Sequence, residues 1–257
     1  MSIRFFSGWA AAILLAGTIS AAAQASSPAP ENSVTAAATA PPVDSGSWAA
    51  AELAKRPWER GVFFQGGKGI GYLIDDYKLL SAGVRLGKVI TNEHLPGILR
   101  GQFEYAGELM PYWEALTPPP HQQLVTYINP GTGGKGSYYA PYGGGDYHGF
   151  SITPIILRWD FQPHGRWAPW FQAAGGLIYT THKFPPDVLV PHGTPGATSV
   201  FNFSPQGGIG VQYFVRPNQS LMLEANGVHI SSASLGDKNP GVNASVQFQI
   251  GYTWWSR

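Results

Sequence analysis

Hydrophobic and polar residues alternate along most of the chain after residue 48. The pattern is clearest over residues 199–215, where one parity is apolar and the other polar: Phe201, Phe203, Ile209, Val211 and Tyr213 against Asn202, Ser204, Gln206 and Gln212. Successive side chains of a β-strand point to opposite faces, so this segment predicts a strand with one apolar and one polar face. The same pattern predicts eight strands, over residues 60–73, 79–91, 98–113, 148–161, 166–183, 199–215, 219–233 and 242–255.

Two architectures fit this alternation, a soluble sandwich and a membrane barrel. Several expected strands exceed the ~9–11 residues that a tilted membrane strand needs, whereas soluble strands average ~5–6 residues. In the third strand, Glu104 and Glu108 lie on the face opposite Leu109, which indicates a polar interior. An even number of strands can also close on itself. We therefore predict an all-β fold, an eight-stranded antiparallel transmembrane β-barrel.

The N-terminal region has a different composition. Arg4 precedes an apolar run over residues 9–19 and a small-residue stretch ending at Ala25, the layout of a cleaved secretory signal over residues 1–25. Residues 26–47 are rich in Ala, Pro, Ser and Thr, which is typical of a flexible leader. The barrel domain is expected over residues 48–257, in the outer membrane of a Gram-negative cell.

Charge and cysteine content exclude some classes of function. The formal net charge is +1 and only 12% of residues are charged, so the chain has no basic footprint for nucleic acid. The chain has no cysteine, so an exported form would have no disulfide framework. These counts disfavour a nucleic-acid-binding protein and a small disulfide-stabilised binding module.

The connections between the expected strands predict which end faces outward. The turns at residues 162–165 and 216–218 are tight, whereas the connections at 114–147, 185–198 and 234–241 are longer. Outer-membrane barrels have short periplasmic turns and longer external loops. The seventh strand therefore runs outward and ends near the outer leaflet.

His229 and Ser231 stand at the outer end of that strand. They share the parity of Leu221 and Leu223, whereas Glu224 has the opposite parity, so both are expected on the lipid-facing surface. A histidine and a serine so placed could act as base and nucleophile. Two polar residues near a strand end can also be purely structural, and this alternative stays open.

Residues 229–241 resemble the outer-membrane lipid A 3-O-deacylases. The likeness lies in a His-x-Ser pattern followed by a loop with Asn and Gly, here His229, Ser231, Ala233, Leu235, Asn239 and Gly241. The family consists of eight-stranded barrels with a Ser-His-Glu triad on the outer wall. The resemblance implies that Ser231 is the nucleophile, that His229 is the base and that lipid A of lipopolysaccharide is the substrate. No cofactor is required for that chemistry.

Two positions depart from the family pattern. Ser232 stands where the family has an asparagine that helps to bind the oxyanion, and Asn243 stands where the family has the triad glutamate. An Asn carbonyl can orient an imidazole but cannot supply a full charge. Asp237 is a conceivable substitute carboxylate. With Val246 outward, Asn243 points to the lumen unless a bulge intervenes.

Two other functions remain open: a barrel of this type that has lost catalysis and serves a structural or surface-binding role, and a soluble exported sandwich that binds a glycan through its aromatic residues.

The Gly-rich segment 66–71 precedes no helical pattern and indicates close strand packing, not a phosphate loop. Four tryptophans are expected at the membrane interfaces: Trp167, Trp170, Trp254 and Trp255. A luminal ion network is expected from Arg85, Arg100, Glu104, Glu108 and Glu224. The histidines show no metal-ligand spacing: His94, His121, His148, His164, His182 and His192.

Overall fold

The computed structural model describes residues 47–71, 74–129, 131–186, 188–189, 199–233 and 243–257. The expected signal over residues 1–25 and the leader up to residue 46 lie outside the described residues. The same holds for residues 234–242, which include Asp237.

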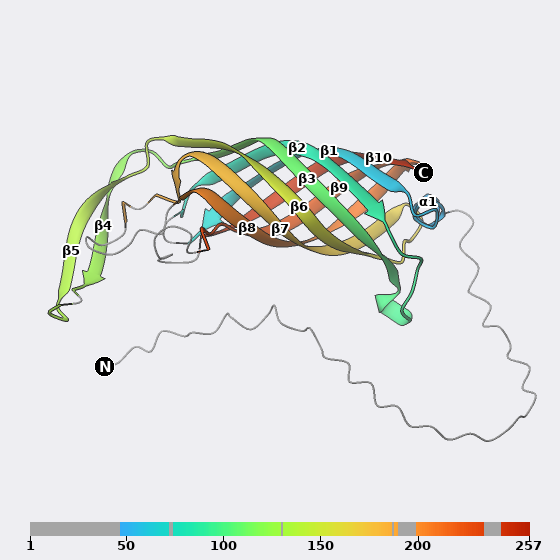
Figure 1. The fold of residues 1–257 in the computed structure, drawn as a ribbon, viewed down its shortest axis with the longest axis horizontal. Helices are drawn as coiled ribbons and strands as arrows, with labels where there is room; N and C mark the ends of the chain where they lie inside the picture. The colour runs from blue at the N-terminus through green and yellow to red at the C-terminus, as the bar shows by residue number, and fades with distance from the viewer. Residues whose placement is uncertain (1–46, 72–73, 130, 187, 190–198, 234–242) are drawn as a thin grey trace, which may run out of the picture. The chain divides into compact units, whose positions relative to one another are not determined.

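Eight antiparallel strands form one closed barrel in the order β1-β10-β9-β8-β7-β6-β3-β2 (Figure 1). These strands are β1 (Trp58–Ile70), β2 (Lys78–Val89), β3 (Gly101–Leu116), β6 (Asp146–Phe161), β7 (Trp167–Phe184), β8 (Ser199–Arg216), β9 (Gln219–His229) and β10 (Ala244–Ser256). The predicted eight-stranded barrel is confirmed. The alternative of a sandwich is wrong, because the eight strands close into one sheet instead of forming two sheets packed face to face.

Two further strands, β4 (His121–Ile128) and β5 (Lys135–Tyr142), pair as a hairpin outside the barrel. The sequence pattern predicted only a long connection here, because Gly and Pro interrupt the alternation on both sides of these strands. The base of the hairpin is anchored by Val125, Ala140 and Tyr142, which belong to the same buried cluster as Tyr77 and Phe184. The hairpin thus continues the hydrophobic packing of the barrel end from which it emerges.

In the second half of the chain the two ends of the barrel differ as predicted. In the first half, the β1–β2 connection over residues 71–77 is shorter than the β2–β3 connection over residues 90–100. Residues 162–166 connect β6 to β7 and residues 217–218 connect β8 to β9, whereas residues 117–145 and 185–198 form the longer connections at the opposite end. The beginning of β1 and the end of β10 lie together at the short-turn end, where Trp58 pairs with Ser256. We refer to this end as the terminal end and to the opposite end as the loop end.

A short helix, α1 (Trp48–Leu53), packs at the terminal end. Ser47 caps it by accepting a hydrogen bond from the Ala50 amide, at 3.2 Å, and the Ser47 hydroxyl donates to the Gly165 carbonyl at 2.7 Å. The apolar side of the helix joins a cluster of buried residues from the barrel: Ala49, Leu53, Val89, Ala168, Phe214 and Trp255. The first described helix is therefore packed onto the barrel by apolar contacts.

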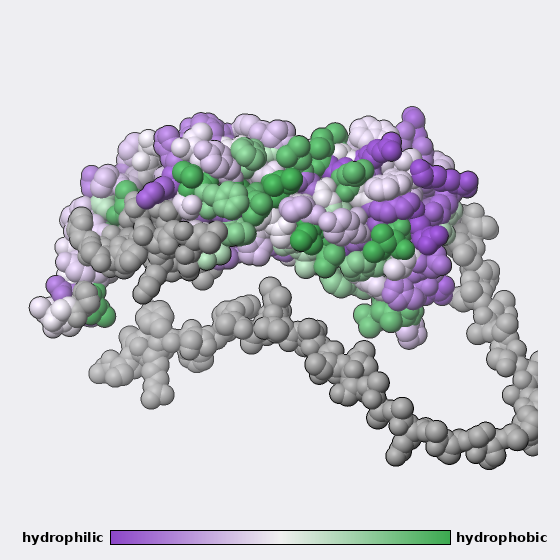
Figure 2. Space-filling view, viewed as in Figure 1, coloured by the Kyte–Doolittle hydropathy of each residue, from purple (hydrophilic) through white to green (hydrophobic). Residues whose placement is uncertain are grey.

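The outer wall of the barrel is apolar. Large side chains such as Leu86, Ile209 and Phe248 are more than half exposed, although they belong to regular strands. Figure 2 shows hydrophobic residues over the middle of the barrel and hydrophilic residues toward the end that carries α1. No helix within the described ranges is long and apolar enough to span a bilayer. An apolar band of this kind around a closed sheet is typical of outer-membrane barrels.

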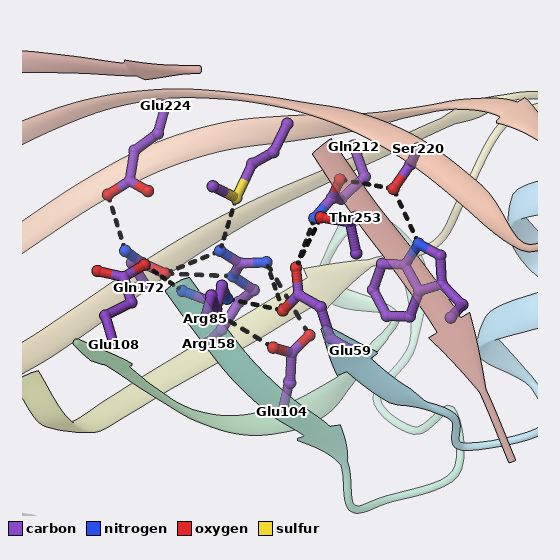
Figure 3. Close-up of polar contacts among 12 residues, drawn as sticks. Glu59, Arg85, Glu104, Glu108, Arg158, Gln172, Gln212, Ser220, Glu224 and Thr253 are labelled. Atoms are coloured by element: carbon purple, nitrogen blue, oxygen red, sulfur yellow. Dashed lines mark hydrogen bonds and ion pairs between the residues drawn. The ribbon is translucent and has the colours of Figure 1, made fainter. Parts of the chain in front are cut away.

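The barrel interior is filled by a polar network centred on two arginines (Figure 3). The Arg85 guanidinium donates to Glu59 at 2.7 Å, to Glu108 at 3.0 Å and to Glu104 at 3.1 Å, and all four side chains are buried. Arg158 donates to Gln172 and lies 3.8 Å from the centre of the Trp170 ring. The predicted luminal network is present, and the sequence reading missed Glu59 and Arg158.

Three residues do not lie where the sequence reading placed them. Arg100 is not luminal: it lies at the terminal end and pairs with Glu93 at 2.6 Å. Trp170 and Trp255 are buried inside the barrel, with 2% and 3% of their surface exposed, so they are not interfacial. The physical reason is the period of a strand, since Trp254 and Trp255 are consecutive and only one of them can point outward.

The glycines of β1 allow its neighbours to approach closely, as the sequence predicted. A Cβ on Gly67 would lie 2.2 Å from the Val246 carbonyl oxygen, and one on Gly69 would lie 2.0 Å from the Ile74 carbonyl oxygen. Both distances are far below van der Waals contact, so only glycine fits at these positions.

Candidate active site on the outer wall

His229 and Ser231 both lie on the outward face at the loop end of β9. The parity is fixed by Leu221 and Leu223, which are exposed, and by Glu224, which is buried in the lumen. His229 pairs with Ala244 of β10, and Ser231 forms an isolated bridge with Phe203 of β8. The predicted outward orientation of the two residues therefore agrees with the structure.

Backbone hydrogen bonds hold Ser231 at the rim. Its amide donates to the Phe203 carbonyl at 2.9 Å, and its carbonyl accepts from the Phe203 amide at 2.7 Å. Two residues later, Ala233 has a positive φ of 50°, so the chain leaves the strand direction directly after the serine. The Ala233 amide donates to the Ser231 hydroxyl oxygen at 3.2 Å. The nucleophile candidate thus stands where the strand becomes a loop, with an amide donor beside it.

Ser232 and Asn243 face the opposite way. Each has 1% of its surface exposed, and each shares the inward parity of its strand with buried neighbours such as Ile230 and Ser245. The pairing of β9 with β10 runs without a register shift from the His229–Ala244 pair to the Gln219–Trp254 pair. No bulge turns Asn243 outward, so it lies on the luminal face.

In the described part of the chain, the side chains of Asn243 and His229 form no hydrogen bond with each other, which agrees with the luminal parity expected for Asn243. The Nδ1 atom of His229 is buried, and it has no hydrogen-bond partner among the residues that the structure describes. The contact between the two residues is made by the backbone, where the Ile230 amide donates to the Asn243 carbonyl at 2.8 Å. The structure therefore brings His229 and Ser231 together on one face and leaves Ser232 and Asn243 on the other. Asp237 lies outside the described residues.

Small residues cover the outer wall directly below His229. On β9 the next outward positions are Gly227 and Ala225, and Gly227 pairs with Gly207 on β8. Gly207 pairs in turn with Ala173 on β7. Because these residues have no long side chains, little projects from the outer wall at this point. The sequence reading missed it, although glycine and alanine at outward-parity positions were a visible signal.

A groove of about 950 Å³ adjoins this small-residue wall. Its lining is almost entirely apolar and crosses several neighbouring strands, with Phe64, Phe171, Ile209, Leu223, Ala225 and Phe248 among its outward residues. Ala225 lies four residues before His229 on the same strand, about 13 Å at the usual rise of a β-strand. The pair therefore stands at the polar end of a continuous apolar surface.

Comparison with known proteins assigns the chain to a family. The family model described as lipid A 3-O-deacylase (PagL) matches residues 100–253. No curated protein sequence matches the chain significantly. Among solved structures, the chain is similar to the outer-membrane enzyme PagL, with 16% identity and a TM-score of 0.40 over 74% of this chain and 97% of that chain. It is similar to the neisserial surface protein NspA, with 17% identity and a TM-score of 0.44 over 77% of this chain and 96% of that chain. The family model covers more than half of the sequence, and the chain therefore belongs to the lipid A 3-O-deacylase (PagL) family.

Proposed function

We propose that this protein is an outer-membrane serine esterase that removes an ester-linked acyl chain from lipid A. Ser231 is the nucleophile and His229 is the general base and acid. The observation that carries the proposal is the outward position of both residues at the loop end of β9, in a member of the lipid A 3-O-deacylase family. A catalytic pair on this face meets its substrate within the membrane, without passage through the lumen.

The proposed reaction has two steps. The Ser231 hydroxyl oxygen attacks the ester carbonyl while His229 accepts its proton, and His229 then returns that proton to the departing sugar oxygen. Water, deprotonated by His229, next attacks the acyl-enzyme, so that the fatty acid leaves and Ser231 regains its proton. Because the Ser232 side chain faces the lumen, we expect the Ala233 amide, which lies beside the Ser231 hydroxyl, to donate to the oxyanion.

The position of the pair suits lipid A. With the short turns in the periplasm, the loop end lies at the outer leaflet, where the sugar and ester groups of lipid A are found. The acyl chains would then lie along the wall of Gly227 and Ala225 and enter the apolar groove below it. The apolar groove would hold the hydrocarbon while the polar end of the wall holds the ester.

The proposal is tested with protein folded in detergent and mixed with lipid A, with the products read by mass spectrometry. The native protein should release a 3-hydroxy fatty acid, and Ser231→Ala should not. Ser245→Ala, which removes a luminal hydroxyl on the neighbouring strand, serves as the matched control and should keep the activity. Release that persists in Ser231→Ala would refute the assigned nucleophile.

A barrel that has lost catalysis is the second candidate. It is favoured by the buried Nδ1 atom of His229, which meets no carboxylate within the described residues. Absence of product from both the native protein and Ser231→Ala, with both correctly folded, would support this candidate. If the native protein is active, comparison with Asp237→Asn decides whether that carboxylate replaces the family glutamate.

A further inference from the structure

A second hollow lies on a different part of the outer wall, across β1, β2, β3 and β6. Its volume is about 420 Å³, and its outward lining residues are Trp58, Val84, Leu86, Lys88, Tyr105, Gly107, Leu109, Ile152 and Pro154. None of these residues borders the groove next to His229. We call this hollow the β2–β3 cleft.

The cleft is built into the sheet by a bulge and a glycine. The register of β3 with β6 shifts between Ala106 and Glu108, so Pro154 and Ile155 both lie on the outer face opposite Gly107. Gly107 supplies the floor, because it has no side chain between the two flanking strands. The Tyr105 hydroxyl donates to the Pro154 carbonyl at 2.7 Å and satisfies an oxygen that the bulge frees from the ladder.

Cationic and aromatic side chains stand at one end of the cleft. Lys88 pairs across the strands with Trp58 and Tyr105, and its ammonium lies 5.2 Å from the centre of the Trp58 ring. That ammonium donates to the Arg56 carbonyl at 2.6 Å, which leaves two of its three N–H groups for a ligand. Arg60 lies on the same outer face, paired with Leu86.

The acidic side chains on the strands near this end of the cleft are turned inward, and Glu108, which also borders the cleft, contacts Arg85 in the lumen. The nearby acids Glu59, Glu104 and Glu108 all point into the lumen, where they contact Arg85. The cleft therefore combines an apolar floor with a positive end. Lys88 and Val84 lie four residues apart along β2, so the cleft extends about 13 Å from its positive end into the apolar wall.

We propose that the β2–β3 cleft binds a phospholipid, with its phosphate at Lys88 and one acyl chain over Gly107. The Lys88 end is the terminal end of the barrel, which faces the periplasm if the chain lies in the outer membrane. The inference rests on that proposed location but not on catalysis. A phosphate group matches a cationic end whose neighbouring carboxylates are turned inward, and a single chain matches a narrow apolar floor. A second barrel copy would bury the same apolar surface but would not explain the cationic end.

The test uses native mass spectrometry of the full-length Ser231→Ala protein in detergent, titrated with dimyristoylphosphatidylglycerol. Loss of esterase activity then has no bearing on the result. One phospholipid should remain bound at collision energies that strip excess lipid. Dimyristoylglycerol, which has the same chains but no phosphate, should not be retained. Equal retention of the two lipids would overturn the assignment of the phosphate to Lys88.

Variants locate the site. Gly107→Leu should abolish the retained adduct by filling the floor, and a Cβ at this position meets nothing closer than 3.4 Å, so the barrel can accept it. Gly107→Ala gives a milder filling and should weaken binding less.

Lys88→Gln should weaken binding about tenfold, the effect of losing one charge-assisted contact. Gly175→Leu is the matched control on β7, where a Cβ meets nothing within 4 Å, and should bind normally. Undiminished binding by correctly folded Gly107→Leu would refute the proposal.

Discussion

The lumen and the outer wall place their polar side chains in opposite surroundings. Inside, Arg85 is shared by three carboxylates, and each member of the group is held by hydrogen bonds and ion pairs. Outside, His229 and Ser231 stand on an apolar surface, and the Nδ1 atom of His229 has no partner among the described residues. The luminal network fills and stabilises the barrel, whereas the outer pair lies where a membrane-embedded substrate could reach it.

This contrast indicates which polar residues of a small membrane barrel are candidates for binding a substrate. A polar group in the lumen has many polar neighbours, so its presence needs no ligand to explain it. A polar group on the lipid-facing wall meets hydrocarbon on most sides, and its desolvation is unfavourable unless something else binds it. We therefore expect substitutions in the lumen to change stability and substitutions on the outer wall to change activity.

The largest expected effect comes from Ser231→Ala. Deacylation of lipid A should fall at least about a thousandfold, because the acyl-enzyme can no longer form. The free energy of unfolding should change by less than about 0.5 kcal/mol, as for other surface positions. Mass spectrometry of the products and a urea titration of the folded barrel measure the two quantities on the same sample. A large loss of stability in this variant would contradict the division between lumen and outer wall.

Arg85→Met should show the opposite behaviour. The substitution leaves buried carboxylates such as Glu59 and Glu104 without their main partner, and we expect the free energy of unfolding to fall by about 3–5 kcal/mol. Arg100→Met is the matched control, because that arginine lies at the rim and pairs with a partly exposed Glu93. Its effect should stay below about 1 kcal/mol. Equal losses in the two variants would show that the luminal network contributes nothing beyond a surface pair.

The same division explains how much the sequence could predict. Lipid outside and a polar lumen inside impose a period of two, so all eight barrel strands were recognisable, with ends that differ by a few residues from those observed. For Trp170, residue type was given more weight than parity, whereas Arg100 has the inward parity but lies before β3 begins at Gly101. The outward position of His229 followed from parity. The hairpin β4–β5 could not be recognised, since its short strands follow no sustained period.

The part of the site that depends on three-dimensional contacts was harder to predict. Alignment with the family pattern placed Asn243 in the role of the triad acid, whereas strand parity placed it on the luminal face unless a bulge intervened. The unbroken register between β9 and β10 settles that question, and places Asn243 on the luminal face. The small-residue wall around Gly227 was readable in principle, because it needs only parity and strand order.

Gly227→Leu tests the outer wall without touching the catalytic pair. A leucine here would stand directly below His229, and a Cβ at this position meets only the Gly207 carbonyl oxygen, at 3.8 Å. The barrel should therefore fold normally. We expect kcat/KM for lipid A to fall about tenfold, mainly through KM, because the acyl chain loses its place on the wall. Leu157→Phe, an enlargement of an outward residue on β6, should leave kcat/KM unchanged. Similar losses in both variants would argue against an acyl path below His229.

The smallest effect is expected from Asn243→Ala, and it separates the family-based prediction from the structural one. If Asn243 orients His229, removal of its carbonyl should lower kcat by a hundredfold or more, as loss of the orienting residue does in triads. Its luminal position predicts instead a change of less than about threefold in kcat, because the His229 ring and the Asn243 side chain lie on opposite faces of the sheet. The free energy of unfolding should fall by about 1 kcal/mol, since a buried polar side chain is lost from the interior. Kinetics with lipid A and a urea titration distinguish the two cases, because the structural role moves stability and the catalytic role moves kcat.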